Sequence, residues 1–143
     1  MARRVLVVDD NEVVGWALQA RLWAAGCEVT PVASAAEAFA ALAQGAFDLV
    51  LMDLDMPDMT GLEALEIIKR RELCPRTPIV LLTASESIDD IISAQARGAS
   101  GYLTKGAART SLMESVERLL AAPGIQWIDD HHCVLAPRAT RAA

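Results

Sequence analysis

Short apolar runs alternate with amphipathic segments along most of the chain. The runs are rich in valine, leucine and isoleucine, have the length of strands and span residues 3–8, 28–32, 49–52, 79–82 and 101–104. After each run, apolar residues recur every three or four positions, which predicts helices over residues 11–26, 35–44, 61–71, 87–97 and 108–122. Strands that alternate with helices in this way predict an α/β fold, with a parallel sheet covered by helices on both faces.

The third apolar run is expected at the centre of this sheet. Leu49–Met52 is apolar at every position, which is typical of a strand buried on both faces. Pro31 in the second run cannot donate a ladder hydrogen bond, so that strand is expected at a sheet edge. Ser34 and Gly45 flank the second helix, the first as its N-cap and the second as its end.

Polar side chains follow four of the five runs, at the point where each predicted strand ends. They are Asp9 and Asp10, Asp53, Thr83, and Lys105. Because the carboxyl ends of parallel strands meet at one edge of a sheet, where open α/β sheets bind ligands, we expect these side chains to form one site. A single aspartate or threonine is as easily a solvated loop residue, but the joint arrangement favours a functional site.

The three carboxylates in this set predict a cation site. Like charges this close repel, so Asp9, Asp10 and Asp53 require a compensating cation. Oxygen ligands without a histidine or cysteine beside them favour Mg²⁺ over zinc. Such an ion binds phosphoryl oxygens, Lys105 adds a second positive charge, and the Thr83 hydroxyl can donate to a phosphoryl oxygen. A carboxylate among these groups can attack phosphorus and form an acyl phosphate.

Composition agrees with a folded domain and argues against several classes of partner. The chain has 143 residues, of which 53% are hydrophobic and 22% charged, as expected for one domain with a sizeable core. Its formal net charge of -6 argues against direct binding to a nucleic-acid backbone. No apolar stretch has the length of a membrane span and no secretory leader precedes Asp9, so we expect a cytoplasmic protein without membrane contact. Cys27, Cys74 and Cys133 are widely spaced and are expected to be free thiols.

Taken together, these motifs resemble the receiver domain of bacterial two-component response regulators. The resemblance covers roughly residues 3–122 and rests on Asp9-Asp10, on Asp53 followed by Met56-Pro57 and Gly61, on Thr83-Ala84, and on Tyr102-x-x-Lys105. The stretch from Gly98 to Ala107 looks most like the receivers of nitrate-regulator-like transcription factors. The resemblance implies a flavodoxin-like (βα)5 three-layer sandwich whose parallel sheet has the strand order 2-1-3-4-5.

The resemblance also implies a role for each residue around the acceptor. Asp53 would be the phosphoacceptor, and Asp10 would ligate Mg²⁺ directly. Asp9 would support the ion largely through water, and the backbone carbonyl of Asp55 would complete the protein ligands. The donor would be a phosphohistidine on a sensor histidine kinase or a phosphotransfer protein, so the chain is expected to act in a phosphorelay.

A second group of residues would detect the phosphoryl group and pass the signal on. By the resemblance, Thr83 and Lys105 contact the phosphoryl group, and Tyr102 is an aromatic switch that turns inward on activation; the alternative for Tyr102 is a half-buried strand residue. The expected output surface comprises the helix at 87–97, the strand at 101–104 and the helix at 108–122, used by a homodimer or another protein partner. The domain would catalyse only its own phosphorylation and slow dephosphorylation, and is otherwise not expected to be an enzyme.

The end of the chain has a different character from the rest. Pro123-Gly124 breaks the last predicted helix, and no helical period follows. Nitrate-regulator-like factors carry a helix-turn-helix domain after a linker, and no such pattern is present here. We therefore expect residues 1–122 to form the receiver domain and residues 123–143 to form a C-terminal tail or the start of a linker.

Two other functions fit parts of the same pattern. A receiver that has lost phosphorylation would be a phosphorylation-independent binding module, although every acceptor-site residue is present. Asp53-Leu54-Asp55 also resembles the nucleophile and acid pair of haloacid-dehalogenase-like phosphatases. In those enzymes the pair lies on the first strand of a larger chain, so the order of the motifs favours the receiver.

Overall fold

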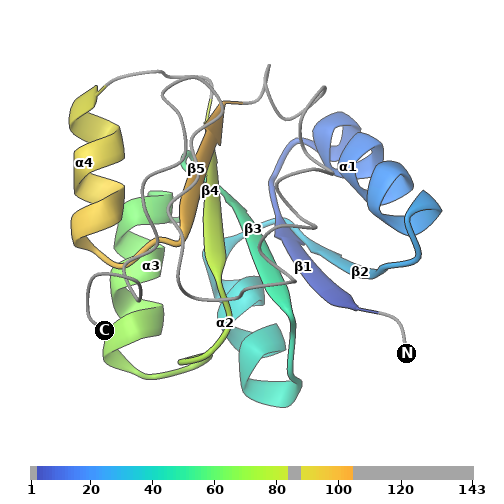
Figure 1. Ribbon diagram of the computed structural model, residues 1–143, viewed down its shortest axis with the longest axis horizontal. Helices are drawn as coiled ribbons and strands as arrows, with labels where there is room; N and C mark the ends of the chain where they lie inside the picture. The colour runs from blue at the N-terminus through green and yellow to red at the C-terminus, as the bar shows by residue number, and fades with distance from the viewer. Residues whose placement is uncertain (1–2, 84–87, 105–143) are drawn as a thin grey trace, which may run out of the picture.

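A single parallel sheet of five strands forms the centre of the computed structural model, which describes residues 3–83 and 88–104 (Figure 1). The strands lie in the order β2-β1-β3-β4-β5, which confirms the expected α/β fold and strand order. They are β1 (Arg4–Val8), β2 (Glu28–Val32), β3 (Leu49–Asp53), β4 (Ile79–Thr83) and β5 (Gly101–Thr104). The described helices are α1 (Glu12–Ala24), α2 (Ala35–Gln44), α3 (Gly61–Arg70) and α4 (Ile88–Ala96). The predicted helix at 108–122 lies outside the described residues.

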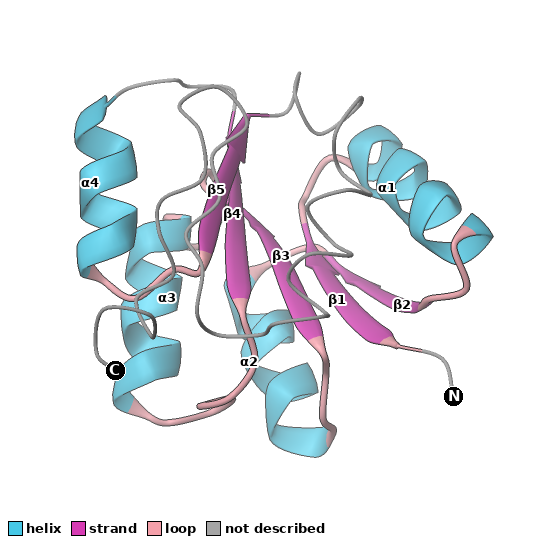
Figure 2. Cartoon of the chain, in the orientation of Figure 1, coloured by secondary structure: helices cyan, strands magenta, loops and turns pink. Residues whose placement is uncertain are grey.

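Helices cover both faces of the sheet (Figure 2). α1 packs on one face, where Leu18 and Leu22 meet alternate residues of β1, β3 and β4. α2, α3 and α4 pack on the other face, against the opposite set of strand residues. Every residue of Leu49–Met52 is 0% exposed, which confirms that the third apolar run is a strand buried on both faces.

The element boundaries agree with the predictions to within about two residues. β2, α2 and β5 have the predicted bounds, and Pro31 lies in β2 at the edge of the sheet. β3 extends one residue further than predicted, because Asp53 keeps its pairing with Leu82 of β4. α1 ends just before Gly26, whose φ of +91° is the left-handed conformation that terminates many helices. In the described part of the chain, every helix is too short or too polar to cross a bilayer.

α1 carries apolar side chains on its exposed face as well as on its buried face. Leu18 and Leu22 are buried, as their four-residue spacing predicts. Val13, Trp16 and Trp23, however, are 71%, 65% and 75% exposed. Large apolar side chains gathered on one exposed surface are typical of a contact site for another molecule.

Two of the three cysteines are free thiols in the core, as predicted. Cys27 and Cys74 are both buried and form no disulfide. Burial raises the pKa of each of the two thiols above its ordinary value. The neutral thiol therefore predominates at neutral pH, and we expect both cysteines to be unreactive. Cys133 lies outside the described residues.

Gly61 lies at the closest approach between the start of α3 and the end of β3. Its N–H donates to the carbonyl of Leu54 at 2.6 Å. A Cβ at this position would lie 2.5 Å from the carbonyl oxygen of Asp53 and 2.9 Å from the Cα of Leu54. Both neighbours are backbone atoms next to the Asp53 side chain, so a larger residue would displace the strand end that carries this carboxylate.

Gly61→Ala is expected to lower the free energy of unfolding by about 1–3 kcal/mol, the usual cost of overpacking. Gly15→Ala in α1 is the matched control, because a Cβ there meets nothing within 4 Å. Alanine in a helix interior should raise stability by about 0.5–1 kcal/mol relative to glycine. Urea unfolding measures both changes, and a Gly61→Ala variant as stable as the wild type would contradict the close packing.

Candidate functional site

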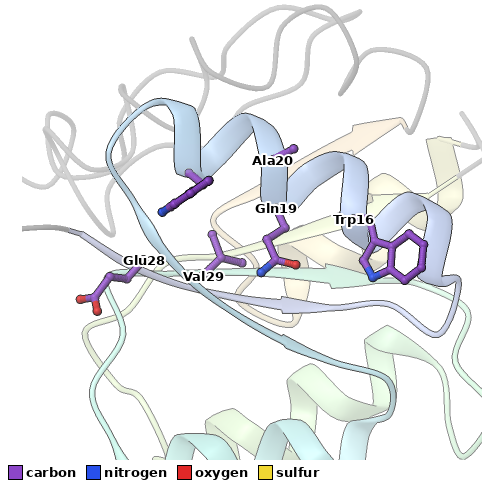
Figure 3. Close-up of a pocket in the computed structure, with 6 residues that line it drawn as sticks. Trp16, Gln19, Ala20, Glu28 and Val29 are labelled. Carbon is purple, nitrogen blue, oxygen red and sulfur yellow. The ribbon is translucent and has the colours of Figure 1, made fainter.

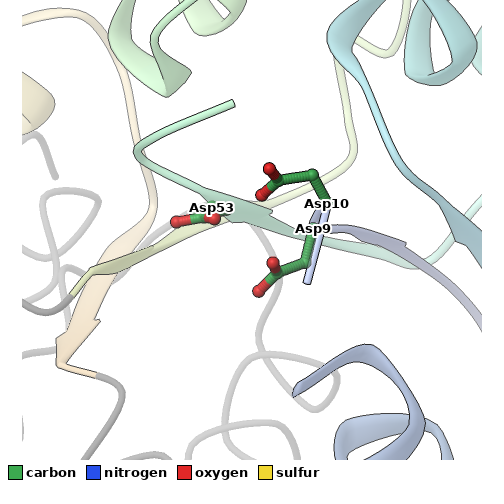
Figure 4. Close-up of side chains that lie close together, drawn as sticks. All are labelled: Asp9, Asp10 and Asp53. Atoms are coloured by element: carbon green, nitrogen blue, oxygen red, sulfur yellow. The ribbon is translucent and has the colours of Figure 1, made fainter. Parts of the chain in front are cut away.

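Three aspartates from two neighbouring strands gather at the carboxyl edge of the sheet (Figure 4). Asp9 and Asp10 follow β1, and Asp53 ends β3. One carboxylate oxygen from each residue lies within 4.8 Å of the other two. Asp9 and Asp53 are only 6% and 3% exposed, whereas Asp10 is exposed. The structure thus brings together all three carboxylates that the strand ends predict.

Backbone hydrogen bonds fix the turn that carries the first two aspartates. The N–H of Asp9 donates to the carbonyl of Val32 at 3.0 Å, which joins the end of β1 to the end of β2. Asp9 Oδ1 accepts from the N–H of Asn11 at 2.9 Å. The Asn11 side chain in turn accepts from the N–H of Val13 at 3.0 Å and caps the start of α1. The strand therefore passes directly into the helix, and Asp10 stays at the sheet edge.

Asp53 is held by its strand and by the residue two positions after it. Asp53 pairs with Leu82 of β4, and the N–H of Leu54 donates to the carbonyl of Leu82 at 2.8 Å. The N–H of Asp55 donates to Asp53 Oδ1 at 3.2 Å. The Asp55 side chain is exposed and does not belong to the carboxylate cluster. Asp55 therefore borders the site through its backbone.

Two further predicted site residues lie in the last strands of the sheet, Thr83 at the end of β4 and Tyr102 within β5. Thr83 pairs with Thr104, so the two strands end side by side, next to the end of β3. Lys105 follows Thr104 in the sequence but lies outside the described residues, and its role stays a prediction. Tyr102 is 1% exposed and packs in the apolar cluster that β5 shares with α2, α3 and α4. It is fully buried, rather than half-buried as the alternative interpretation of this residue expected.

The loop between β3 and α3 is tied to α2 by a residue that the sequence pattern does not single out. Asp58 Oδ1 accepts from the N–H of Ala35 at 3.1 Å, and Asp58 Oδ2 accepts from the N–H of Ala36 at 3.0 Å. These hydrogen bonds lower the pKa of the Asp58 carboxyl below its ordinary value. The bonds consequently stabilise the fold at neutral pH, and this contribution is lost as the pH falls through the lowered pKa.

The carboxylate cluster fits a hard divalent cation. Among the described residues its donors are three carboxylate oxygens, without histidine or cysteine. Mg²⁺ and Ca²⁺ prefer such donors, and Mg²⁺ in particular is commonly bound through one or two carboxylates plus water or phosphate oxygens. In the absence of a cation, two unit charges 4.8 Å apart repel by about 1 kcal/mol even at the dielectric constant of water. A cation would turn this repulsion into attraction.

Comparison with known proteins identifies the family. The family model of the response regulator receiver domain matches residues 5–117. The chain belongs to this family. The matched range contains the carboxylate cluster and the ends of β4 and β5, so the receiver resemblance of the sequence motifs is confirmed.

The most informative relatives are regulators and a solved receiver structure. The response regulator protein FleR of Pseudomonas aeruginosa is 37% identical over 118 residues, and the transcriptional regulator NtrC of Escherichia coli is 37% identical over 117 residues. Each match covers 82% of this chain but 24% of the relative, so the chain spans about a quarter of their length. The solved structure of the chemotaxis response regulator CheY4 of Vibrio cholerae has a TM-score of 0.78 and 31% identity, and the match covers 83% of this chain and 99% of that chain. This likeness confirms the flavodoxin-like fold class.

Asp10→Asn is expected to stabilise the metal-free protein, because it removes one of three charges that lie within 4.8 Å of one another. The free energy of unfolding should rise by about 1 kcal/mol in the presence of a chelator. Glu72→Gln, which removes an exposed charge outside the cluster, should leave stability unchanged. Urea unfolding in EDTA measures both variants, and a loss of stability in Asp10→Asn would show that repulsion does not dominate the cluster.

Proposed function

We propose that the chain is the phosphoacceptor receiver of a cytoplasmic two-component phosphorelay, with Asp53 as the acceptor. The observation that carries this proposal is the position of Asp53, which is 3% exposed at the end of β3 and lies within 4.8 Å of Asp9 and Asp10. Membership of the receiver family supports the class of reaction. The same membership favours a receiver over a phosphatase of the haloacid-dehalogenase type.

Phosphoryl transfer would build an acyl phosphate on Asp53. An oxygen of its carboxylate forms a bond to phosphorus while the phosphorus–nitrogen bond of a donor phosphohistidine breaks, and the imidazole nitrogen keeps the electron pair of that bond. The hydrogen bond from the N–H of Asp55 to Asp53 Oδ1 orients the carboxylate. Thr83 and Lys105 would donate to the phosphoryl oxygens. The domain would act only on its own acceptor and turn over no other substrate.

The carboxylate cluster would hold Mg²⁺. Asp9, Asp10 and Asp53 supply the clustered oxygens, and the backbone carbonyl of Asp55 would add a further ligand. When bound, Mg²⁺ offsets the negative charge that develops on the phosphoryl oxygens. Burial of Asp9 and Asp53 limits competition from bulk water, whereas Asp10 is exposed to solvent.

The exposed apolar face of α1 supports a protein partner that contacts this helix. Trp16 and Trp23 line a groove of about 540 Å³ between α1 and β2. Figure 3 shows Trp16 and Gln19 on the helix and Val29 on the strand around this groove. Because α1 begins two residues after Asp10, Trp16 lies only about 6 Å along the helix from its start. We propose that this face binds the sensor histidine kinase or phosphotransfer protein that carries the phosphohistidine.

The output surface is proposed on α4 and β5, together with the predicted helix at 108–122. Ile92 on α4 is 57% exposed, and Tyr102 on β5 lies in the same apolar cluster as Ala94 of α4. A similar solved structure is the beryllofluoride-activated receiver domain dimer of NtrC4, with 26% identity and a TM-score of 0.76 over 82% of this chain and 96% of that chain. This likeness supports a homodimer as one form of the output.

Incubation with Mg²⁺ and acetyl phosphate is expected to add one phosphoryl group to the protein, measured as intact mass. Asp53→Asn should abolish the adduct, because the amide cannot replace the carboxylate as nucleophile. Glu72→Gln, which removes an exposed charge outside the cluster, should keep the adduct and is the matched control. Removal of Mg²⁺ with EDTA should reduce the yield by about 10-fold or more.

Each other outcome of this experiment points to a different function. An adduct that persists in Asp53→Asn would contradict the choice of acceptor. A folded protein that forms no adduct would favour the phosphorylation-independent binding module. Release of phosphate without an adduct would instead favour a phosphatase.

Trp16→Ala is expected to slow phosphoryl transfer from the cognate phosphohistidine protein by about 10-fold or more. Tryptophans that become buried when two proteins bind contribute strongly to the binding energy of many interfaces. Phosphorylation by acetyl phosphate should be unchanged. Ile92→Ala removes an exposed apolar side chain from α4 and serves as the control. Initial rates with the two donors measure the effect. If Trp16→Ala slows both donors equally, the substitution disturbs the acceptor site and α1 is not the docking surface.

A further inference from the structure

Hydrogen bonds join three connections at the carboxyl edge of the sheet. The N–H of Asp9 donates to the carbonyl of Val32, which links the end of β1 to the end of β2. The N–H groups of Ala35 and Ala36, at the start of α2, donate to the carboxylate of Asp58 in the β3–α3 loop. The turn after β1, the connection from β2 to α2 and the loop after β3 are therefore held together, and Asp58 makes the last link.

Asp58 links the β3–α3 loop to the start of α2, and its role is therefore not limited to capping α3, the helix that follows it. Its two oxygens accept from Ala35 and Ala36 at 3.1 and 3.0 Å, and these N–H groups lie in the first turn of α2, where no helical acceptor is available. α2 has a separate N-cap in Ser34, whose Oγ accepts from the N–H of Glu37 at 3.2 Å. The lowered pKa of Asp58 agrees with a carboxylate that is charged at neutral pH.

The loop that Asp58 anchors is the one that borders the proposed acceptor site. Asp58 lies three residues after Asp55, whose N–H donates to Asp53 Oδ1. Within the loop, Asp55 and Thr60 flank Asp58 and pair with each other in an isolated antiparallel β-bridge. A displacement of Asp58 would therefore act on the backbone of Asp55, three residues away along the same loop.

We infer that Asp58 is a positioning residue for phosphorylation at Asp53: by binding the start of α2 it holds the backbone of Asp55 beside the carboxylate cluster. The inference rests on the proposed function, in which the carbonyl of Asp55 helps to hold Mg²⁺. Loss of the tether should weaken Mg²⁺ binding because the carbonyl is no longer held in place. It should leave the rate at saturating Mg²⁺ close to that of the wild type, because the nucleophile is unchanged.

The Mg²⁺ dependence of phosphorylation by acetyl phosphate tests this role in a matched pair of variants. Asp58→Ala should raise the half-saturating Mg²⁺ concentration by about 10-fold, the lower end of the range for residues that support metal ligands. Ser34→Ala removes the N-cap of the same helix without touching the loop, and should lower stability but leave the Mg²⁺ dependence unchanged. Asp58→Asn keeps one acceptor oxygen and should lie between Asp58→Ala and the wild type.

Several outcomes would overturn the inference. An unchanged half-saturating concentration in folded Asp58→Ala would do so, and so would an equal shift in Ser34→Ala, because the effect would then belong to the stability of α2. If Asp58→Ala does not fold, Asp58→Asn provides the same comparison. Calorimetric titration with Mg²⁺ alone separates this inference from the proposed function: weaker binding in Asp58→Ala supports the tether even if the wild type is not phosphorylated.

Discussion

The fold must hold three mutually repelling carboxylates together at one edge of the sheet. Asp9, Asp10 and Asp53 hold oxygens within 4.8 Å of one another, and two of these side chains are buried. Only a rigid scaffold can keep like charges this close. β1 and β3 provide it, because they pair in parallel register up to Val8 and Met52 and are packed by apolar side chains on both faces. The apolar core thus holds the three carboxylates close together, and a bound cation would make this arrangement favourable.

Backbone groups orient the buried carboxylates and pack closely around them. The N–H of Asn11 binds Asp9, and the N–H of Asp55 binds Asp53, so each buried carboxylate is oriented by a residue two positions later. Gly61 allows α3 to start against the backbone of β3. Such contacts make the site sensitive to small movements of the loops, a property that would suit the proposed role of the domain as a conformational switch.

The fold and the carboxylate cluster could be predicted from the sequence because both follow from local patterns. Apolar periodicity marks strands and helices, and parallel strands bring residues such as Asp53 to one edge. Strand order came only from family resemblance, since periodicity does not specify which strands are neighbours. Asp58 was missed because an aspartate in a turn is usually explained locally, whereas its partners lie 22 and 23 residues away. The sequence pattern does not predict the exposure of Trp16 and Trp23, because aromatic residues occur on both the buried and the exposed faces of helices.

Chemical identification of the phosphorylated residue would show whether Asp53 is the acceptor. Borohydride reduces an aspartyl phosphate to homoserine, and peptide mapping by mass spectrometry then locates the modified position. We expect homoserine at position 53 alone, and only after incubation with both Mg²⁺ and a phosphodonor. Homoserine at position 9 or 10, or a phosphoryl adduct that borohydride does not convert at position 53, would contradict it.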